Sequence, residues 1–314
     1  MIRGLCFALL LAASSLAQAN PEAIQWLERM VSSSQMLNYD GTFIYMHGKQ
    51  LEAMSIVHRY DGDQEHERLL SLNGEAREVV RKGNNVTCIW PDSQKVMVDH
   101  GVKKTFPAKL PADLVALTPV YEFKMLGEAR IAQRITQIVQ IKPRDRYRYG
   151  FKLWLDKETA LPLRSIRTDS VGQPIEQVMY TDFTLQPKAG LQKTLPRIMG
   201  KSYSWVINDD NNEMSSATTH WTFSQLPAGF TLKRVIMEQM PNVAEKVERL
   251  VFSDGLSTIS VYIEKKQGKA PLSGGSKMGA MTAFGVNKEG YYITAVGEVP
   301  QITTRLLASA LKLQ

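Results

Sequence analysis

The sequence predicts a mainly β protein with some α-helix, divided into two domains. Short runs of alternating apolar and polar residues recur along the chain, and turn signals such as Asn73-Gly74 and Asp254-Gly255 separate them. Apolar residues at helical spacing follow residue 20 and recur near the C-terminus. The length of 314 residues indicates two domains, because a single domain usually has about 100–200 residues.

Residues 1–19 have the features of a secretory signal peptide. Arg3 gives a positive start, Leu5–Leu16 is apolar, and Ala17-Gln18-Ala19 is a small-residue cleavage site. The apolar run is shorter than the roughly 20 residues that span a bilayer, and a buried N-terminal helix is the alternative. We expect export to the periplasm and a soluble mature chain that begins near Asn20.

Charge and cysteine usage limit the partners. The net charge of +7 favours an anionic lipid, lipopolysaccharide or an acidic protein over nucleic acid in an exported protein, although a generic basic surface explains it equally well. Export removes Cys6 and leaves Cys88 as the single cysteine, so no disulfide forms within the chain. Pairing between chains, and hence a homodimer, stays open. The strand-like run around Cys88 favours a buried structural thiol.

The first domain, residues 20–185, is predicted to be a helix followed by an antiparallel meander. Pro21–Asn38 shows helical spacing, and a proline suits its first turn. The period then changes to two, which favours a sandwich or a barrel with a helix or two over it, interrupted by a helical or loop insertion at Lys109–Leu117. The predicted strands are Thr42–His47, Leu51–Tyr60, Glu67–Leu72, Ala76–Lys82, Val86–Trp90, Lys95–Val98, Lys103–Phe106, Glu122–Leu126, Arg134–Ile141, Tyr147–Leu155, Leu163–Thr168 and Glu176–Leu185.

One segment of this domain, Arg144–Leu155, alternates strongly. Its aromatic face, which includes Tyr149 and Phe151, must be buried or line a cavity. Its basic face is expected to point to solvent or to an anion such as a lipopolysaccharide phosphate, and it carries Arg144, Arg146 and Arg148. An ordinary amphipathic strand explains most of the same pattern.

The second domain, residues 216–314, follows a predicted linker at 186–215 that contains Pro, Gly and a cluster of Asn and Asp. A small α+β domain is predicted, with a helix on one face of a sheet. Lys265–Lys277 is polar and Gly-rich, so we expect a mobile loop there. The predicted strands and closing helix are Thr231–Met237, Val247–Phe252, Thr258–Glu264, Ala280–Val286, Tyr291–Val296 and Pro300–Leu313.

The sequence contains no recognisable catalytic, metal-binding or phosphate-binding motif. None of the five histidines has a zinc-binding spacing. Ser273–Gly279 matches neither a nucleophile elbow nor a phosphate-binding loop, and no carboxylates form a recognisable acid–base pair. A pairing of Cys88 with a histidine is the remaining catalytic alternative. We therefore expect a binding protein with no catalytic residues, no metal and no cofactor.

Several long motifs, in order along the chain, resemble those of the MucB/RseB family of periplasmic sigma-factor regulators. They begin with Trp26-Leu27 in the first helix and extend nearly to the C-terminus. The others are Tyr39–Tyr45, Glu67–Gly74, Arg77–Arg81, Pro143–Phe151, Leu155-Asp156, Leu161–Leu163, Leu226–Phe230, Ser253–Leu256 and Val296–Pro300.

The resemblance implies a fold and a function. The first domain would be an unclosed β-barrel with covering helices, like the lipoprotein carriers, and the second a smaller α+β domain. The protein would bind the periplasmic part of a membrane-anchored anti-sigma factor and shield it from site-one proteolysis, until lipid or lipopolysaccharide releases it. A periplasmic lipid or lipoprotein carrier is the alternative, although a carrier would need only the first domain.

The family supplies no short motif for contact residues, so the candidates follow from residue type. Large apolar and aromatic side chains are expected to line a lipid pocket in the first domain: Trp90, Phe106, Tyr121, Phe123, Tyr149 and Phe151. Aromatic and arginine side chains are expected to contact the partner from the second domain: Trp221, Phe230, Arg249, Phe252 and Tyr262. Core packing is the alternative role for each residue in both sets.

Overall fold

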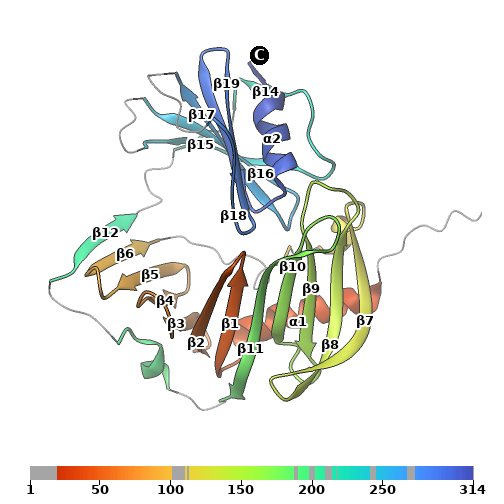
Figure 1. Ribbon diagram of the computed structural model, residues 1–314, viewed down its shortest axis with the longest axis vertical. Coiled ribbons are helices and arrows are strands. Elements are labelled where there is room, and N and C mark those ends of the chain that lie inside the picture. Colours follow the sequence, from red (N-terminus) through yellow and green to blue (C-terminus); the bar gives the residue numbers. More distant parts are fainter. Residues whose placement is uncertain are drawn as a thin grey trace, which may run out of the picture.

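The computed structural model describes residues 20–100, 110–111, 113–186, 190–197, 202–208, 214–216, 218–240, 245–266 and 273–313. The predicted signal peptide, the predicted strand Lys103–Phe106 and the candidate residue Phe106 lie outside these ranges. The chain forms a large sheet followed by a smaller one, and Figure 1 shows the smaller domain standing on one end of the larger. The described part of the chain contains no helix long and apolar enough to cross a membrane.

The larger sheet has twelve strands and does not close on itself. Its order is β12-β6-β5-β4-β3-β2-β1-β11-β10-β9-β8-β7, so β12 and β7 are the edges, and among the described strands only β12 and β6 pair in parallel. This open, curved sheet confirms the fold predicted for the first domain. The strands are β1 Tyr39–His47, β2 Gln50–Tyr60, β3 Glu65–Ser71, β4 Glu78–Lys82, β5 Asn85–Trp90, β6 Lys95–Asp99, β7 Tyr121–Ile131, β8 Arg134–Pro143, β9 Gly150–Asp156, β10 Pro162–Thr168, β11 Pro174–Leu185 and β12 Ser204–Asn208.

The helix α1, Pro21–Met36, covers β7–β9. The side chain of Asn20 caps it by accepting hydrogen bonds from the first backbone N–H groups. Leu27 and Met30 are fully buried against the sheet, next to the short 3-10 helix η1, Val115–Leu117. Each buried side chain of this size stabilises the fold by about 1.5–3 kcal/mol, so packing holds α1 in place.

The smaller sheet has seven strands in the order β13-β15-β16-β17-β20-β19-β18, and α2, Gln301–Ala310, packs on one of its faces. The predicted sheet with a helix on one face is therefore confirmed. A separate pair joins β14 to β21. The strands are β13 Met214–Ser216, β14 Trp221–Phe223, β15 Thr231–Glu238, β16 Val247–Ser253, β17 Thr258–Lys265, β18 Gly274–Met278, β19 Met281–Lys288, β20 Tyr291–Gly297 and β21 Leu311–Leu313.

Several elements differ from the prediction, and β12, β13 and β14 were not predicted as strands. The end of the expected loop Lys265–Lys277 lies in β18, whose Gly-rich backbone is held by pairing with β19 rather than by strand-forming side chains. The closing helix ends at Ala310, because the next three residues pair with β14. The strand expected at Tyr147–Leu155 begins only at Gly150, and the alternating residues before it, from Arg144, form an irregular connection.

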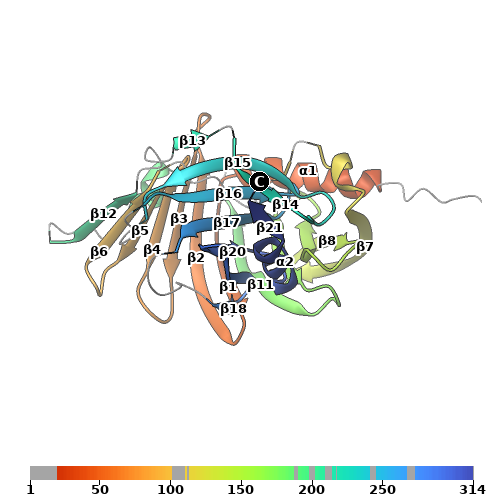
Figure 2. The ribbon, with the colours of Figure 1, turned by 90° about the horizontal axis from the view of Figure 1, so that it is seen from above.

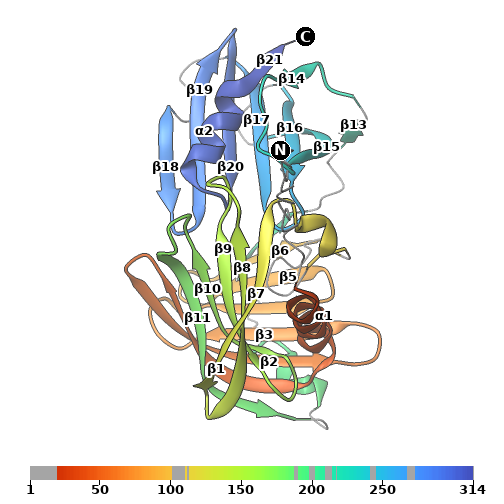
Figure 3. The ribbon, with the colours of Figure 1, turned by 90° about the vertical axis from the view of Figure 1, so that its right-hand side faces the viewer.

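The two sheets meet at the end of the larger one that carries this β8–β9 connection (Figure 3). Seen from above, β15–β17 run across the direction of β2–β6 (Figure 2). Residues 204–208, inside the predicted linker, form β12 on the larger sheet. The segment that contains the 3-10 helix η2, Leu191–Thr194, is hydrogen-bonded to the same sheet. Both carboxylate oxygens of the buried Glu78 accept hydrogen bonds from the backbone N–H of Arg197 at 3.1 Å.

Candidate functional site

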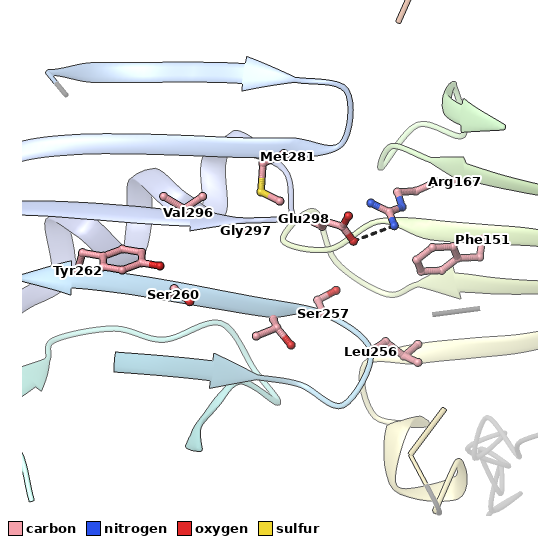
Figure 4. A pocket seen from close by; sticks show the side chains of 11 residues that line it. Phe151, Arg167, Leu256, Ser257, Ser260, Tyr262, Met281, Val296, Gly297 and Glu298 are labelled. Atoms are coloured by element: carbon pink, nitrogen blue, oxygen red, sulfur yellow. Dashed lines mark hydrogen bonds and ion pairs between the residues drawn. The ribbon is translucent and has the colours of Figure 1, made fainter. Parts of the chain in front are cut away.

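A cavity lies between the two domains, where β9 and β10 meet β17 and β20. Its volume is about 360 Å³, which is within the usual range for small-ligand pockets of about 300–1,000 Å³. Phe151 and Arg167 of the larger domain face the smaller domain across it (Figure 4). The smaller domain contributes Leu256, Ser257, Thr258, Ser260, Tyr262, Met281, Val296, Gly297 and Glu298.

Strand alternation aims the side chains of the smaller domain at the cavity. In β17, Ile259 and Val261 are buried in the core with α2, so Ser260 and Tyr262 lie on the opposite face of the sheet. Val296 of β20 pairs with Ser260 and shares that face. The wall therefore combines hydroxyl groups with apolar side chains.

Arg148 makes the central contact between the domains. Its side chain is fully buried, and its Nη1 donates to Oδ2 of Asp254, also fully buried, at 2.7 Å. Its Nε and Nη2 each donate to Asp145 at 3.0 Å, and Nη2 also donates to the carbonyl oxygen of Ala228. Four of the five N–H donors of a guanidinium are thus satisfied, and the pair forms a fixed joint.

The turn that carries Asp254 is built for this contact. Oδ1 of Asp254 accepts from the backbone N–H of Leu256 and Ser257, while Oδ2 also accepts from the hydroxyl of Tyr121 at 3.0 Å. Gly255 has φ of +104°, a conformation that favours glycine, and a Cβ there would lie 2.9 Å from the side chain of Leu117. Because Leu256 and Ser257 also line the cavity, the same turn forms the joint and part of the cavity wall.

Arg167 makes a second charged contact at the cavity. Its Nη2 donates to Oε2 of Glu298 at 2.9 Å, and its Nη1 lies 3.5 Å from Oε2 of Glu176 in its own domain. The guanidinium carbon lies 5.5 Å from the ring centroid of Phe151. Nε and Nη1 of Arg167 are buried without a hydrogen-bond acceptor among the described residues. Since buried donors normally have acceptors, this contact is incompletely satisfied.

The candidate lipid-pocket residues do not share one pocket. Tyr121 and Phe123 are buried in the core beneath α1, Tyr149 is buried, and Trp90 is half-buried at the end of β5. Among the described lipid-pocket candidates, only Phe151 lines the interdomain cavity.

The candidate anion-binding arginines also separate. Arg144 and Arg146 are exposed, and Nε of Arg144 donates to the carbonyl oxygen of Thr118 at 2.9 Å. Arg148 instead points inward to Asp254, because the chain has left the strand geometry that would place all three on one face.

The candidate partner residues divide in the same way. Trp221, Phe230 and Phe252 belong to the core of the smaller domain. Arg249 and Tyr262 are half-buried on the sheet face opposite α2, with the guanidinium 5.5 Å from the ring centroid. Nε of Arg249 donates to the hydroxyl of Ser260 at 3.1 Å, so this pair continues the cavity wall along the sheet.

Residue type alone missed most of the cavity. Arg167, Met281 and Glu298 were not candidates, although Glu298 and Leu256 lie in Val296–Pro300 and Ser253–Leu256, two of the motifs that carry the family resemblance. Both motifs end or join strands at the interface between domains. Family motifs at strand ends, combined with the expectation of two domains, were the available signal.

Other reactive groups lie elsewhere. Cys88 is half-buried rather than buried, and burial followed by Asp99 raises the pKa of its thiol. His58 is buried in the first domain and stacks on Tyr39. Within the described ranges, no three His, Cys, Asp or Glu side chains are grouped so that they could hold a metal ion.

An open curved sheet, a smaller sheet-and-helix domain and a cavity between them define a class: a two-domain protein with a cavity at its domain interface. The model of the MucB/RseB N-terminal domain matches residues 22–199, and that of the MucB/RseB C-terminal domain matches residues 215–312. The chain belongs to the MucB/RseB family.

Relatives cover nearly the whole chain. "Sigma factor AlgU regulatory protein MucB" of Pseudomonas aeruginosa is 30% identical over 299 residues, which cover 93% of this chain and 91% of the relative. "Sigma-E factor regulatory protein RseB" of Escherichia coli K12 is 27% identical and covers 99% and 98%. The solved complex of Pseudomonas aeruginosa MucA/MucB has a TM-score of 0.72 at 27% identity, covering 93% of this chain and 99% of that chain.

Proposed function

We propose that this protein is a periplasmic negative regulator of an envelope-stress sigma factor. It binds the periplasmic region of a membrane-anchored anti-sigma factor and shields that region from site-one proteolysis. Family membership and the names of the relatives as sigma-factor regulatory proteins support this function, as does the match to MucB solved together with MucA. The signal peptide expected at residues 1–19 would place the protein in the periplasm.

The observation that carries the proposal is the cavity between the domains. It combines hydroxyl donors, a charged pair and apolar walls, which is the composition expected of a specific binding site. The stacked pair Arg249 and Tyr262 extends it along the sheet face that α2 leaves uncovered. Tyrosine and arginine contribute most strongly to protein interfaces. We therefore place the anti-sigma segment along this face and into the cavity.

The test is a binding measurement with the purified periplasmic region of the anti-sigma factor from the same cell. Replacement of Tyr262 by alanine should weaken binding about tenfold or more, since the ring forms the wall of the site. Tyr60→Ala is the matched control, because Tyr60 is a half-buried tyrosine at the end of β2, outside the cavity. Equal affinity of the two variants, or no binding by the unmodified protein, would refute the proposal.

We further propose that a lipid or lipopolysaccharide ligand competes with the anti-sigma segment. Phe151 faces the cavity, and the exposed Arg144 and Arg146 lie in the β8–β9 connection next to the joint. Burial of an acyl chain contributes about 0.8 kcal/mol per CH₂. Titration of lipopolysaccharide into the protein–partner complex should release the partner, and unchanged partner affinity would exclude this mechanism. Mass measurement of the free protein in the same series tests for a homodimer.

A further inference from the structure

The larger sheet has one protected edge and one unprotected edge. At the β7 edge, Glu122, Lys124 and Glu128 supply charges, and the pairing with β8 shifts its register between Met125 and Glu128. Charged side chains and bulges are the features by which natural sheets avoid pairing with further strands. The other edge, β12, contains no charged residue and no proline, and its register with β6 is continuous. β12 is therefore the edge that is suited to pair with another strand.

β12 also exposes apolar side chains on both of its faces. Trp205 is 50% exposed, Val206 53% and Ile207 61%. Strand alternation places Trp205 and Ile207 on one face of the sheet and Val206 on the other. Figure 1 and Figure 2 show the strand at the outer margin of the larger sheet. Contiguous exposed apolar side chains are typical of interaction sites, whereas single ones are common on any surface.

The backbone groups of β12 alternate in the same way. The N–H of Ser204 donates to the carbonyl oxygen of Gln94, just before β6, at 2.8 Å. In a parallel pair the N–H and C=O of one residue point to the same neighbour. Ser204 and Val206 therefore face β6, while Trp205 and Ile207 direct their backbone groups outward. Among the described strands none pairs with this outer side.

The outward groups have a register that matches a second copy of the same strand. In an antiparallel pair centred on Val206, Trp205 of each copy lies opposite Ile207 of the other. These two residues then form the hydrogen-bonded pairs, and the two Val206 residues form the non-hydrogen-bonded pair between them. Each outward N–H and C=O thus meets a partner, and the apolar side chains cover one another on both faces.

The neighbouring strand favours the antiparallel direction. In β6, Lys95 lies beside Ser204, and Asp99 lies beside Asn208. Antiparallel pairing places Lys95 of each copy in the same cross-strand row as Asp99 of the other. Parallel pairing in register would instead align like charges, which is unfavourable across a sheet.

We propose that β12 is a dimerisation edge: two copies of this chain pair through it in antiparallel register, about a two-fold axis at Val206, and join their larger sheets into one. The two-fold closes the assembly at two copies, since pairing uses the open edge of each. A five-residue edge buries less surface than the roughly 1,200–2,000 Å² of a stable interface, so the dimer is weak, with a dissociation constant of about 10–100 µM. This inference does not depend on the proposed function.

The dimer forms without a disulfide. Cys88 lies in β5, and β6 and β12 separate it from the edge. At about 4.8 Å per strand, the two Cys88 residues of the dimer are about 24 Å apart. Pairing between chains through this cysteine is therefore a different assembly from the one proposed.

Cysteine cross-linking tests the register directly. In a Cys88→Ser background, Val206→Cys brings the two substituted Cα atoms to about 4.5 Å, within the range of a disulfide. Ser204→Cys is the matched control, because Ser204 is exposed on the same face of the same strand but lies about 14 Å from its counterpart. After oxidation of the mature protein with copper phenanthroline, Val206→Cys should give at least about tenfold more covalent dimer than Ser204→Cys.

Sedimentation equilibrium measures the dimer in the protein without added cysteines. Ile207→Lys places a charge on the edge and should raise the dissociation constant by about tenfold or more. Val171→Lys is the control, since Val171 is 78% exposed in the turn between β10 and β11. It adds the same charge away from β12 and should leave the dissociation constant unchanged.

Three results would overturn the inference: equal cross-linking of Val206→Cys and Ser204→Cys, a monomer at every concentration measured, or a dimer that Ile207→Lys leaves intact. Addition of the anti-sigma region, at concentrations where the protein is monomeric, gives a further test. If that region protects the Val206→Cys thiol from alkylation, the edge binds the anti-sigma factor and the proposal of a second copy is wrong.

Discussion

Two arginines cross the same domain interface and behave differently. Arg148 is fully buried, faces a fully buried carboxylate and has acceptors from both domains for four of its five N–H donors. Arg167 contacts a carboxylate that is 46% exposed and retains buried donors without acceptors among the described residues. The first contact fixes how the domains meet, and the second leaves hydrogen-bonding capacity beside a cavity.

The difference shows how one domain interface can be held rigidly and still contain a cavity that can take up a ligand. The joint and the cavity share the turn Ser253–Ser257, so the position of the cavity wall depends on the Arg148–Asp254 pair. A ligand in the cavity gains from a wall that is already in place, because ordering it on binding would reduce affinity. The Arg148–Asp254 pair thus holds in place the cavity wall beside Arg167.

The largest expected effect is that of Arg148→Ala. Removing the guanidinium leaves Asp254 buried without its ion-pair partner, which should lower the free energy of unfolding by about 3–5 kcal/mol. Urea denaturation measures this change. Arg146→Ala is the control, since that exposed side chain should alter stability by less than about 0.5 kcal/mol. Equal effects would show that Arg148 is not the joint.

Alkaline titration of one tyrosine beside each arginine should show that the surroundings of the two arginines differ. Burial raises the pKa of Tyr149, near Arg167, to about 12. Burial followed by Asp254 raises the pKa of Tyr121, beside Arg148, well above its usual value. Because an unfolded tyrosine ionises near pH 10, both groups stabilise the fold fully below pH 10, and this stability is lost as the pH rises through the folded pKa.

Absorbance of the phenolate, compared between Tyr149→Phe and Tyr121→Phe, assigns the two ionisations. Tyr149 should ionise in the folded protein near pH 12, and Tyr121 only as the protein unfolds. The free energy of unfolding should fall above pH 10, and it should fall less steeply in either variant. A Tyr121 that ionises before Tyr149 would contradict the contrast between the two contacts.

The smallest expected effect is that of Arg167→Ala. Glu298 remains partly hydrated when its partner is lost, so the free energy of unfolding should decrease by only about 1 kcal/mol. Double-mutant cycles of Arg167 with Glu298 and of Arg148 with Asp254 measure the two couplings directly. A coupling for Arg167–Glu298 as large as that for Arg148–Asp254 would remove the distinction.

The sequence predicted most strands of both sheets, because buried residues such as Phe123 and Val261 alternate with polar neighbours wherever one face is buried. It failed where pairing partners, rather than side chains, hold a strand. β18 consists of Gly274–Met278, and its backbone bonds to β19 decide its structure. Strong alternation also misled at Arg144–Tyr149, where the contact with Asp254 and the chain reversal between β8 and β9 outweigh the pattern.

The candidate site was less predictable than the fold. Aromatic residue type selected Trp221 and Phe252, which pack in the core, as readily as Tyr262, which lines the cavity. Nothing in the sequence around Arg167 predicted that it lines the cavity, since that position depends on the distant carboxylates and the cavity next to it.

By itself, the sequence determined the family, the β-rich class and the sheet-and-helix form of the second domain, because periodicity and motif order are properties of the chain. Only the tertiary structure decided that Arg148 joins the domains and that Phe151 and Tyr262 share a cavity. Their roles depend on contacts between residues about 100 positions apart, and no local pattern encodes which distant side chains will meet.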